Sequence, residues 1–132
     1  MLARREHSAF EIRRKLKQRD IGDAEIEQAV EHLQQEGLLS DQRYAESYIH
    51  LRKSKGYGPL RIALELRERG VAESDYEQYL YHRDIDWRSV LEAACDKKFG
   101  GRTCDDYREK AKRIRYLQYR GFALDEIHEL LD

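Results

Sequence analysis

One short pattern recurs three times along this chain of 132 residues. It consists of Leu-x-x-Arg, then glycine or aspartate, then an apolar residue, and it occupies residues 16–21, 66–71 and 117–122. Successive copies begin 50 and 51 residues apart. A near-constant period of this length is typical of repeat proteins, in which each repeat is one supersecondary unit that packs on its neighbours. The sequence therefore predicts a tandem array instead of a single rounded domain.

Each copy of the pattern is predicted to be a turn between two helices. Gly70 and Gly121 stand where a helix ends on a residue with positive φ, and Asp20 takes this place in the first copy. After each turn, apolar residues follow the spacing i, i+3, i+4, which places them on one face of an α-helix. These residues are Ile26, Ala29, Val30, Tyr76, Tyr79, Leu80, Ile127, Leu130 and Leu131.

Two further amphipathic helices separate the copies. Ser40 and Asp41 precede one of them, and Asp84 and Asp86 precede the other; all four are residue types that cap helix N-termini. The apolar stripes of these two helices are predicted to contain Tyr44, Ala45, Tyr48, Ile49, Trp87, Val90, Leu91 and Ala94.

Together these signals predict an all-α fold of tandem three-helix repeats in an elongated, curved array. The repeats are expected at residues 1–38, 39–84 and 85–132. The first repeat is predicted to lack most of its opening helix, of which residues 1–6 would form the last turn. Ser8 and Glu11 then form an S-x-x-E capping box that begins the next helix.

Composition and charge narrow the classes of function. The 25 basic and 26 acidic side chains nearly cancel, so contact with a polyanion requires local segregation of charge. None of the five histidines has the spacing of a metal or catalytic motif, and the chain has no glycine-rich phosphate loop. We therefore predict a protein that is not an enzyme, with no catalytic residues, metal site, cofactor or small-molecule substrate.

The cysteines and the hydropathy pattern indicate the compartment. Cys95 and Cys104 have eight residues between them, a poor match to zinc-site spacing, and are predicted to be free thiols in a reducing compartment. No apolar run is long enough for a membrane span. We expect a cytoplasmic protein that does not enter a membrane.

Basic residues gather in three segments, which are predicted to lie on the second helix of their repeats. If the repeats stack in register, these helices would present a common basic strip to phosphates or to an acidic protein groove. The alternative is that each segment is a solvated face neutralised by glutamates such as Glu65, Glu68 and Glu109. The segments contain Arg13, Arg14, Lys15, Lys17 and Arg19; Arg52, Lys53, Lys55 and Arg61; and Lys110, Lys112, Arg113, Arg115 and Arg120.

The tyrosines divide into two groups. Tyr44, Tyr48, Tyr76 and Tyr79 fall on the apolar stripes and are predicted to be core residues. Tyr57, Tyr116 and Tyr119 lie in or beside the basic segments and are candidates for contact with a partner, because aromatic and arginine side chains contribute much of the energy of interfaces. The candidate partner-binding residues are Arg13, Arg14, Lys17, Arg52, Lys53, Lys55, Tyr57, Arg61, Lys110, Arg113, Arg115, Tyr119 and Arg120.

Several motifs resemble those of the bacterial RecX family over essentially the whole chain. They lie at Arg5–Ser8, Lys55–Pro59, Asp84–Trp87, Lys98–Gly100 and Arg120–Phe122. The resemblance implies three tandem three-helix repeats and a regulator that binds in the groove of the RecA filament on DNA. It also implies inhibition of the ATPase, recombinase and coprotease activities of RecA. One departure is that family members usually carry a full helix before the Arg-Glu-His-Ser motif.

Three hypotheses therefore remain open. The first is a protein that binds the RecA filament, as the resemblance implies. The main alternative is a helical module that binds single- or double-stranded DNA through its phosphates, independently of base sequence. The third is a general protein-interaction scaffold, whose binding would not depend on Lys53, Lys55 or Arg61.

Overall fold

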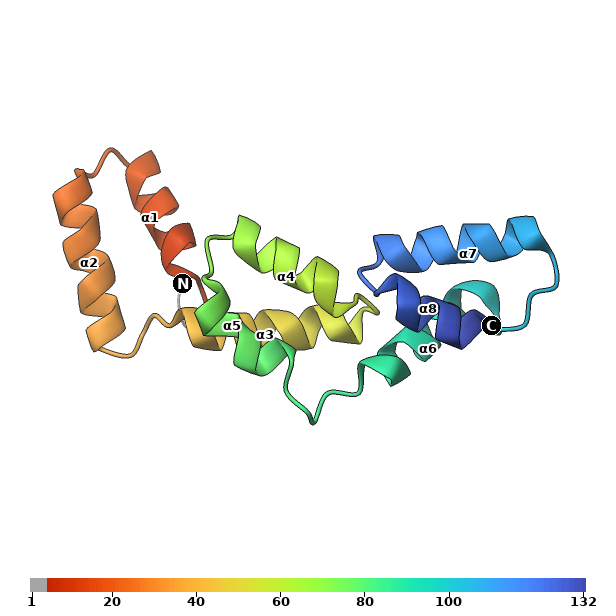
Figure 1. The fold of residues 1–132 in the computed structure, drawn as a ribbon. Coiled ribbons are helices and arrows are strands. Elements are labelled where there is room, and N and C mark those ends of the chain that lie inside the picture. The colour runs from red at the N-terminus through yellow and green to blue at the C-terminus, as the bar shows by residue number, and fades with distance from the viewer. Residues whose placement is uncertain (1–4) are drawn as a thin grey trace.

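The computed structural model describes residues 5–132, which form eight α-helices and no strand. The helices lie in an elongated, shallow arc (Figure 1). Their order is α1 (Ala9–Gln18), α2 (Asp23–Gln35), α3 (Asp41–Ser54), α4 (Pro59–Glu68), α5 (Glu73–Leu80), α6 (Trp87–Phe99), α7 (Tyr107–Tyr119) and α8 (Leu124–Leu131). The predicted all-α repeat fold is confirmed.

The helix starts that the sequence predicted are confirmed by their hydrogen bonds. The Ser8 hydroxyl accepts from the Glu11 amide at 3.1 Å, and the Glu11 carboxylate accepts from the Ser8 amide at 3.0 Å, which completes the capping box. The side chains of Ser40 and Asp86 cap α3 and α6 by accepting from the amides of Arg43 and Ser89, each at 3.2 Å. The turns follow the repeat as well, since φ is 59° at Asp20, 74° at Gly70 and 105° at Gly121.

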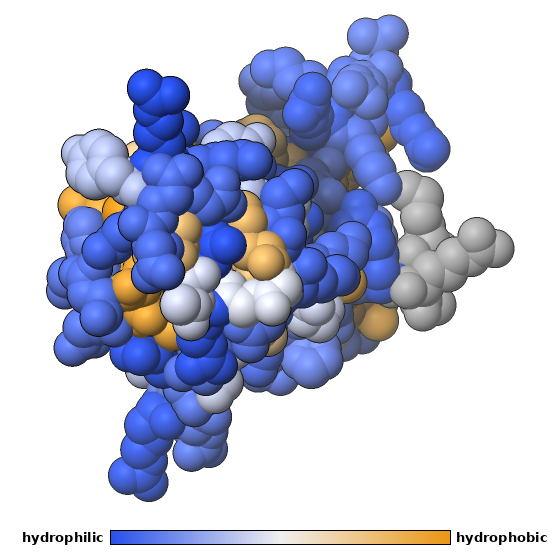
Figure 2. Space-filling model, turned by 90° about the vertical axis from the view of Figure 1, so that its right-hand side faces the viewer, coloured by the Kyte–Doolittle hydropathy of each residue, from blue (hydrophilic) through white to orange (hydrophobic). Residues whose placement is uncertain are grey.

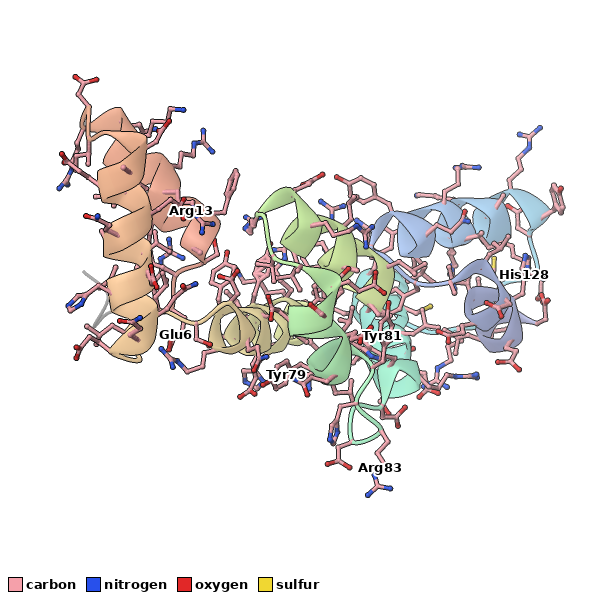
Figure 3. The ribbon with its side chains drawn as sticks, turned by 60° about the vertical axis from the view of Figure 1, so that its left-hand side comes forward. Glu6, Arg13, Tyr79, Tyr81, Arg83 and His128 are labelled. Carbon is pink, nitrogen blue, oxygen red and sulfur yellow. The ribbon has the colours of Figure 1, made fainter. Side chains whose placement is uncertain are left out.

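The predicted helical turn over residues 1–6 is wrong at Arg5 and Glu6, which are irregular, while residues 1–4 lie outside the described part. Arg5 pairs with Glu11 at 2.8 Å, so side-chain contacts with α1 hold this residue instead of the helical hydrogen bonds of a preceding helix. Glu6 is instead paired with Arg43 of α3, with 2.9 Å between Oε1 and Nε (Figure 3).

The buried residues form three separate clusters. One lies between α1 and α2, the second lies among α3, α4 and α5, and the third lies among α6, α7 and α8. Tyr44 and Tyr76 are buried in the second cluster, and Tyr48 and Tyr79 pack against it, so the predicted core role of these tyrosines is confirmed. Because extensive helix–helix packing stays within these groups, separate contacts must hold the groups in line.

Those contacts are made where the end of one helix meets the start of another. The start of α4 lies against the end of α7, where the Gly58 amide donates to the Arg120 carbonyl at 2.7 Å and the Leu60 amide donates to the Gly121 carbonyl at 3.0 Å. Helix ends have backbone groups without intrahelical partners, and here the two ends satisfy each other. Their dipoles are also aligned head to tail. We call this contact the α4–α7 joint.

A related joint connects the start of α1 to the end of α4. The Ser8 hydroxyl donates to the Arg69 carbonyl at 3.4 Å, and the Ala9 amide donates to Asp41 Oδ1 at 2.8 Å. Phe10 packs so closely on Gly70 that a Cβ atom there would lie 2.6 Å from the Phe10 Cβ. As a result, α1, α4 and α7 follow one another along the same edge of the arc (Figure 1).

Trp87 makes a third link, between the second and third units. The sequence placed its side chain on the apolar stripe of its own helix, but the ring packs on the preceding unit instead. Its indole Nε1 donates to the Leu80 carbonyl at 2.9 Å, and its ring packs with Ile85 against the core of the preceding unit. The cause is its position as the first residue of α6, where the side chain reaches back over the preceding connection.

Because of the α4–α7 joint, we expect a glycine-to-serine substitution to affect stability differently at Gly22 and at Gly58. Gly22 and Gly58 both cap a helix with extended backbone, but a Cβ at Gly22 meets nothing within 4 Å, whereas at Gly58 it would lie 2.4 Å from the Gly121 carbonyl oxygen. Serine is a favourable N-cap, so Gly22→Ser should leave the free energy of unfolding unchanged or slightly raised. Gly58→Ser should lower it by about 1–3 kcal/mol through overpacking. Urea denaturation measures both, and equal effects would contradict the joint.

Candidate macromolecular interface

The middle basic segment surrounds one half-buried carboxylate. Glu65 accepts two hydrogen bonds from the Arg52 guanidinium, at 2.9 and 3.0 Å, and one from Arg61 at 3.1 Å. The Tyr48 hydroxyl donates a fourth at 2.8 Å. The side chains of Arg52, Arg61 and Glu65 are only 18%, 26% and 13% exposed, so these two arginines stabilise the second unit instead of facing a partner.

Burial and hydrogen bonding in this network shift the pKa values of Glu65 and Tyr48. Burial acts to raise the pKa of Glu65, but hydrogen bonds from Arg52, Tyr48 and Arg61 outweigh it and hold that pKa below the ordinary glutamate value. Burial, and then the hydrogen bond to Glu65, raise the pKa of Tyr48 to about 12. Glu65 is therefore ionised and Tyr48 is neutral at neutral pH.

Tyr57, a predicted partner contact, is enclosed by arginines. The Arg52 guanidinium lies 3.7 Å and the Arg120 guanidinium 3.9 Å from the ring centroid, and Arg61 lies at 5.1 Å. Cation–π contacts of this kind are attractive when the groups are partly desolvated. Tyr57 thus joins the two sides of the α4–α7 joint, where it is held by cations of α3, α4 and the end of α7.

Arg61 and Arg120 hold the same joint through backbone carbonyls. Arg120 donates to the Gly56 carbonyl at 3.3 Å and also to the Lys55 carbonyl. In the opposite direction, Arg61 donates to the Tyr119 carbonyl at 3.0 Å and lies 4.5 Å from the centroid of the Tyr119 ring. The Tyr119 side chain itself is 68% exposed and stays available at the surface.

Three other predicted residues are also engaged within the chain. Arg113 is half-buried, pairs with Glu109 at 3.3 Å and donates to the carbonyls of Gly101 and Thr103. Arg13 on α1 pairs with Glu27 of α2 at 2.8 Å in an exposed position (Figure 3). Lys110 pairs with Asp132. The neutralisation by Glu65 and Glu109 that the alternative predicted is therefore confirmed for Arg52, Arg61 and Arg113, but these side chains are largely buried and do not form the solvated faces that it also predicted.

The remaining candidates keep free charges. Within residues 5–132, none of Arg14, Lys17, Lys53, Lys55 and Arg115 makes an ion pair, and all but the half-buried Lys53 are exposed. Arg14 and Lys17 lie on α1 and Arg115 lies on α7, at the two ends of the row of second helices.

The prediction that all basic segments lie on the second helix of their repeats is wrong for the middle one. Arg52 and Lys53 belong to the last turn of α3, Lys55 caps that helix, and only Arg61 lies on α4. The cause is that the Lys-Gly-Tyr-Gly-Pro motif spans the turn between α3 and α4. Gly56 takes a positive φ of 85° after α3, and Pro59 is the first residue of α4.

The structure also describes the possible metal ligands and the two thiols. Among the residues that the structure describes, no three His, Cys, Asp or Glu side chains gather where they could hold a metal ion. Cys95 is buried, Cys104 is half-buried, and both are free thiols.

No helix in residues 5–132 is both long and apolar enough to cross a membrane. Seen from the end that the third unit forms, the surface is mainly hydrophilic with small hydrophobic areas (Figure 2).

The fold and the joints define the class of the molecule as a helical repeat protein built from three-helix units. The comparisons with known proteins give its family. Models of the first, second and third three-helix domains of RecX match residues 1–33, 40–80 and 86–131. The chain belongs to the RecX family of regulatory proteins.

Relatives and solved structures agree with this assignment. Regulatory protein RecX of Pseudomonas putida (strain GB-1) is 47% identical over 131 residues, which cover 99% of this chain and 84% of that protein. The RecX of Pseudomonas entomophila (strain L48) is 46% identical with the same coverage. The crystal structure of RecX from Lactobacillus salivarius is similar in fold, with a TM-score of 0.81 at 24% identity over 98% of this chain and 86% of that one.

The Glu65 network predicts a large difference between two Glu→Gln substitutions. Glu65→Gln removes the half-buried charge that balances two arginines and should lower the free energy of unfolding by about 1–3 kcal/mol. Glu27→Gln breaks an exposed pair and should change it by less than about 0.5 kcal/mol. Chemical denaturation at neutral pH measures both.

The pH dependence of the free energy of unfolding tests whether Glu65 is held as a carboxylate. Because the pKa of Glu65 is lowered in the folded state, its stabilisation is complete above the ordinary glutamate pKa and is lost as pH falls through the lowered value. The difference between the natural chain and Glu65→Gln should therefore shrink in acid. A difference that is constant over this pH range would show that Glu65 is not held as a carboxylate.

Proposed function

We propose that this chain binds the RecA–DNA filament and lowers the ATPase, recombinase and coprotease activities of RecA. The match of all three units to RecX domain models carries this proposal. Relatives at 46–47% identity that bear the name regulatory protein RecX support it. With RecA as its partner, the chain would act in the cytoplasm and would regulate RecA without catalysing a reaction itself.

The shape of the molecule supports a partner that is long and regular. The row of α1, α4 and α7 extends along one edge of the arc, and the two helix-end joints keep these helices at defined distances (Figure 1). A filament presents equivalent surfaces at regular intervals, which such an array can contact at several points at once. Several weak contacts made by one molecule then combine to give a higher affinity for the filament.

The free cations suit the negative charge of a nucleoprotein filament. We propose Arg14, Lys17, Lys53, Lys55, Arg115 and the exposed ring of Tyr119 as the groups that meet the partner. The other sequence candidates act indirectly: Arg52, Arg61, Tyr57 and Arg120 hold the α4–α7 joint, and Arg113 holds the third unit. Charge reversal at Arg61 would therefore test folding more than binding.

A second candidate function is sequence-independent binding to bare DNA. It is favoured by Lys17, Lys53 and Lys55, which have no carboxylate partner in the described residues, since such groups can neutralise phosphates. Binding of this kind weakens steeply as salt rises, with a slope that follows the number of phosphates contacted. Strong binding to the RecA filament together with negligible binding to bare DNA would exclude it as the main activity.

The first test is the DNA-dependent ATPase rate of RecA during titration with this protein. The rate should fall as the protein is added, and Arg14→Glu and Arg115→Glu should each raise the concentration for half inhibition by about fivefold or more. Arg83→Glu makes the same change of charge at the tip of the α5–α6 connection, where the side chain points away from the helices, and should have no effect (Figure 3). An ATPase rate that stays constant at micromolar concentrations of both proteins would refute the proposal.

A further inference from the structure

A cleft of about 690 Å³ lies beside the α4–α7 joint. The end of α3 and the turn that follows it form one wall, and α6 with the end of α7 forms the other. This volume is within the range of about 300–1,000 Å³ that is usual for sites of small ligands. The cleft therefore has the size of a ligand site, at a place where two units meet.

The charge of the cleft is entirely positive. Lys53 and Lys55 line the first wall, and Lys97 and Lys98 line the second, while no aspartate or glutamate lines either one. None of these lysines makes an ion pair with another described residue, and Arg120, which also lines the cleft, donates only to backbone carbonyls there and has no carboxylate partner in the described residues. Like charges that face one another without a counter-ion repel, so an anion in the cleft would relieve an unfavourable arrangement.

The base of the cleft is apolar and has small side chains. Val90, Ala93 and Ala94 of α6 form it, and Ala93 is exposed there. Tyr116 adds an aromatic side, with the Lys98 ammonium 5.3 Å from its ring centroid. A ligand that carries both an anionic and an uncharged part would thus find a complementary surface for each.

The first wall is held in place before any ligand arrives. Arg120 donates to the carbonyls of Lys55 and Gly56, which fixes the turn that carries the two lysines. Gly56 has a φ of 85°, and a Cβ at this position would lie 3.0 Å from the Arg120 Nη2 atom. A preformed wall lowers the entropic cost of binding.

We propose that this cleft binds a small polyphosphate ligand of the nucleoside triphosphate class. The four ammonium groups would contact the phosphates as point charges, and the nucleoside would lie on the apolar base. A single ligand is favoured over a nucleic-acid strand because strand binding relies on a series of aromatic faces for stacking, and the cleft offers one such ring, Tyr116. The ring of Tyr57, which also lines the cleft, is already in contact with the Arg52 and Arg120 guanidinium groups.

The test is titration calorimetry of the full chain with ATP, with inorganic tripolyphosphate and with adenosine, in the absence of RecA. ATP should bind saturably in the micromolar to millimolar range, and adenosine should not bind. Equal affinity for ATP and tripolyphosphate would assign the site to the phosphates alone, and tighter binding of ATP would add the contact with the apolar base. Since no RecA is present, the result is independent of the proposed regulation of RecA.

Substitutions locate the ligand. Lys53→Gln with Lys97→Gln removes one charge from each wall and should weaken ATP binding about tenfold or more. The matched control, Arg83→Gln with Lys112→Gln, removes two exposed charges outside the cleft and should leave the affinity unchanged. Ala93→Glu places a carboxylate on the base and should abolish binding, while circular dichroism confirms that α6 is intact.

Two results would overturn the proposal. One is the absence of saturable heat with both ATP and tripolyphosphate at millimolar concentration. The other is binding that the two lysine substitutions and the control substitutions weaken equally, because it would reflect only the net charge of the chain. Lysine-dependent binding of a DNA oligonucleotide without binding of ATP would assign the cleft to a nucleic-acid strand instead.

Discussion

The arrangement of the three units depends on hydrogen bonds between the end of one helix and the start of another. Each unit has a small core of its own, and these cores are not continuous. At the α4–α7 joint, amides at the start of α4 donate to carbonyls at the end of α7, so groups that helices leave unpaired satisfy one another. Such bonds are directional and hold the angle between units, which burial of apolar area alone does not specify.

Arginines and lysines have separate roles in this structure. Arg52, Arg61, Arg113 and Arg120 bind carboxylates and carbonyls and lie against aromatic rings, because a planar guanidinium can make several directed contacts at once. Lysines at the same joint end in a compact, strongly hydrated charge and stay unpaired in the described residues. The basic segments are therefore partly scaffold and partly surface, and their number of charges alone does not reveal which residues meet a partner.

The motif that carries the clearest resemblance to RecX now has a structural explanation. In Lys55–Pro59, two carbonyls accept from Arg120, the tyrosine ring lies between guanidinium groups, Gly58 leaves room for the Gly121 carbonyl, and Pro59 begins α4. Each residue of the motif serves the α4–α7 joint. Trp87, in a second motif, connects the same pair of units through its hydrogen bond to the Leu80 carbonyl and its packing on the second core. The backbone and ring contacts of these two motifs thus connect the second and third units, while the Lys55 side chain stays exposed at the surface.

The sequence by itself determined the all-α repeat fold, the helix starts at Ser8, Ser40 and Asp86, and the turns at Asp20, Gly70 and Gly121, because capping, positive φ and helical spacing are local properties. It also named the glutamates that neutralise Arg52, Arg61 and Arg113. It did not reveal that Tyr57 and Arg120 meet at a joint, that Trp87 packs on the preceding unit, or that Lys97 and Lys98 face Lys53 and Lys55 across a cleft. Those relations join residues 7 to 63 positions apart and depend on the angle between units. Only the tertiary structure decided them, since the directional bonds at the helix ends set that angle.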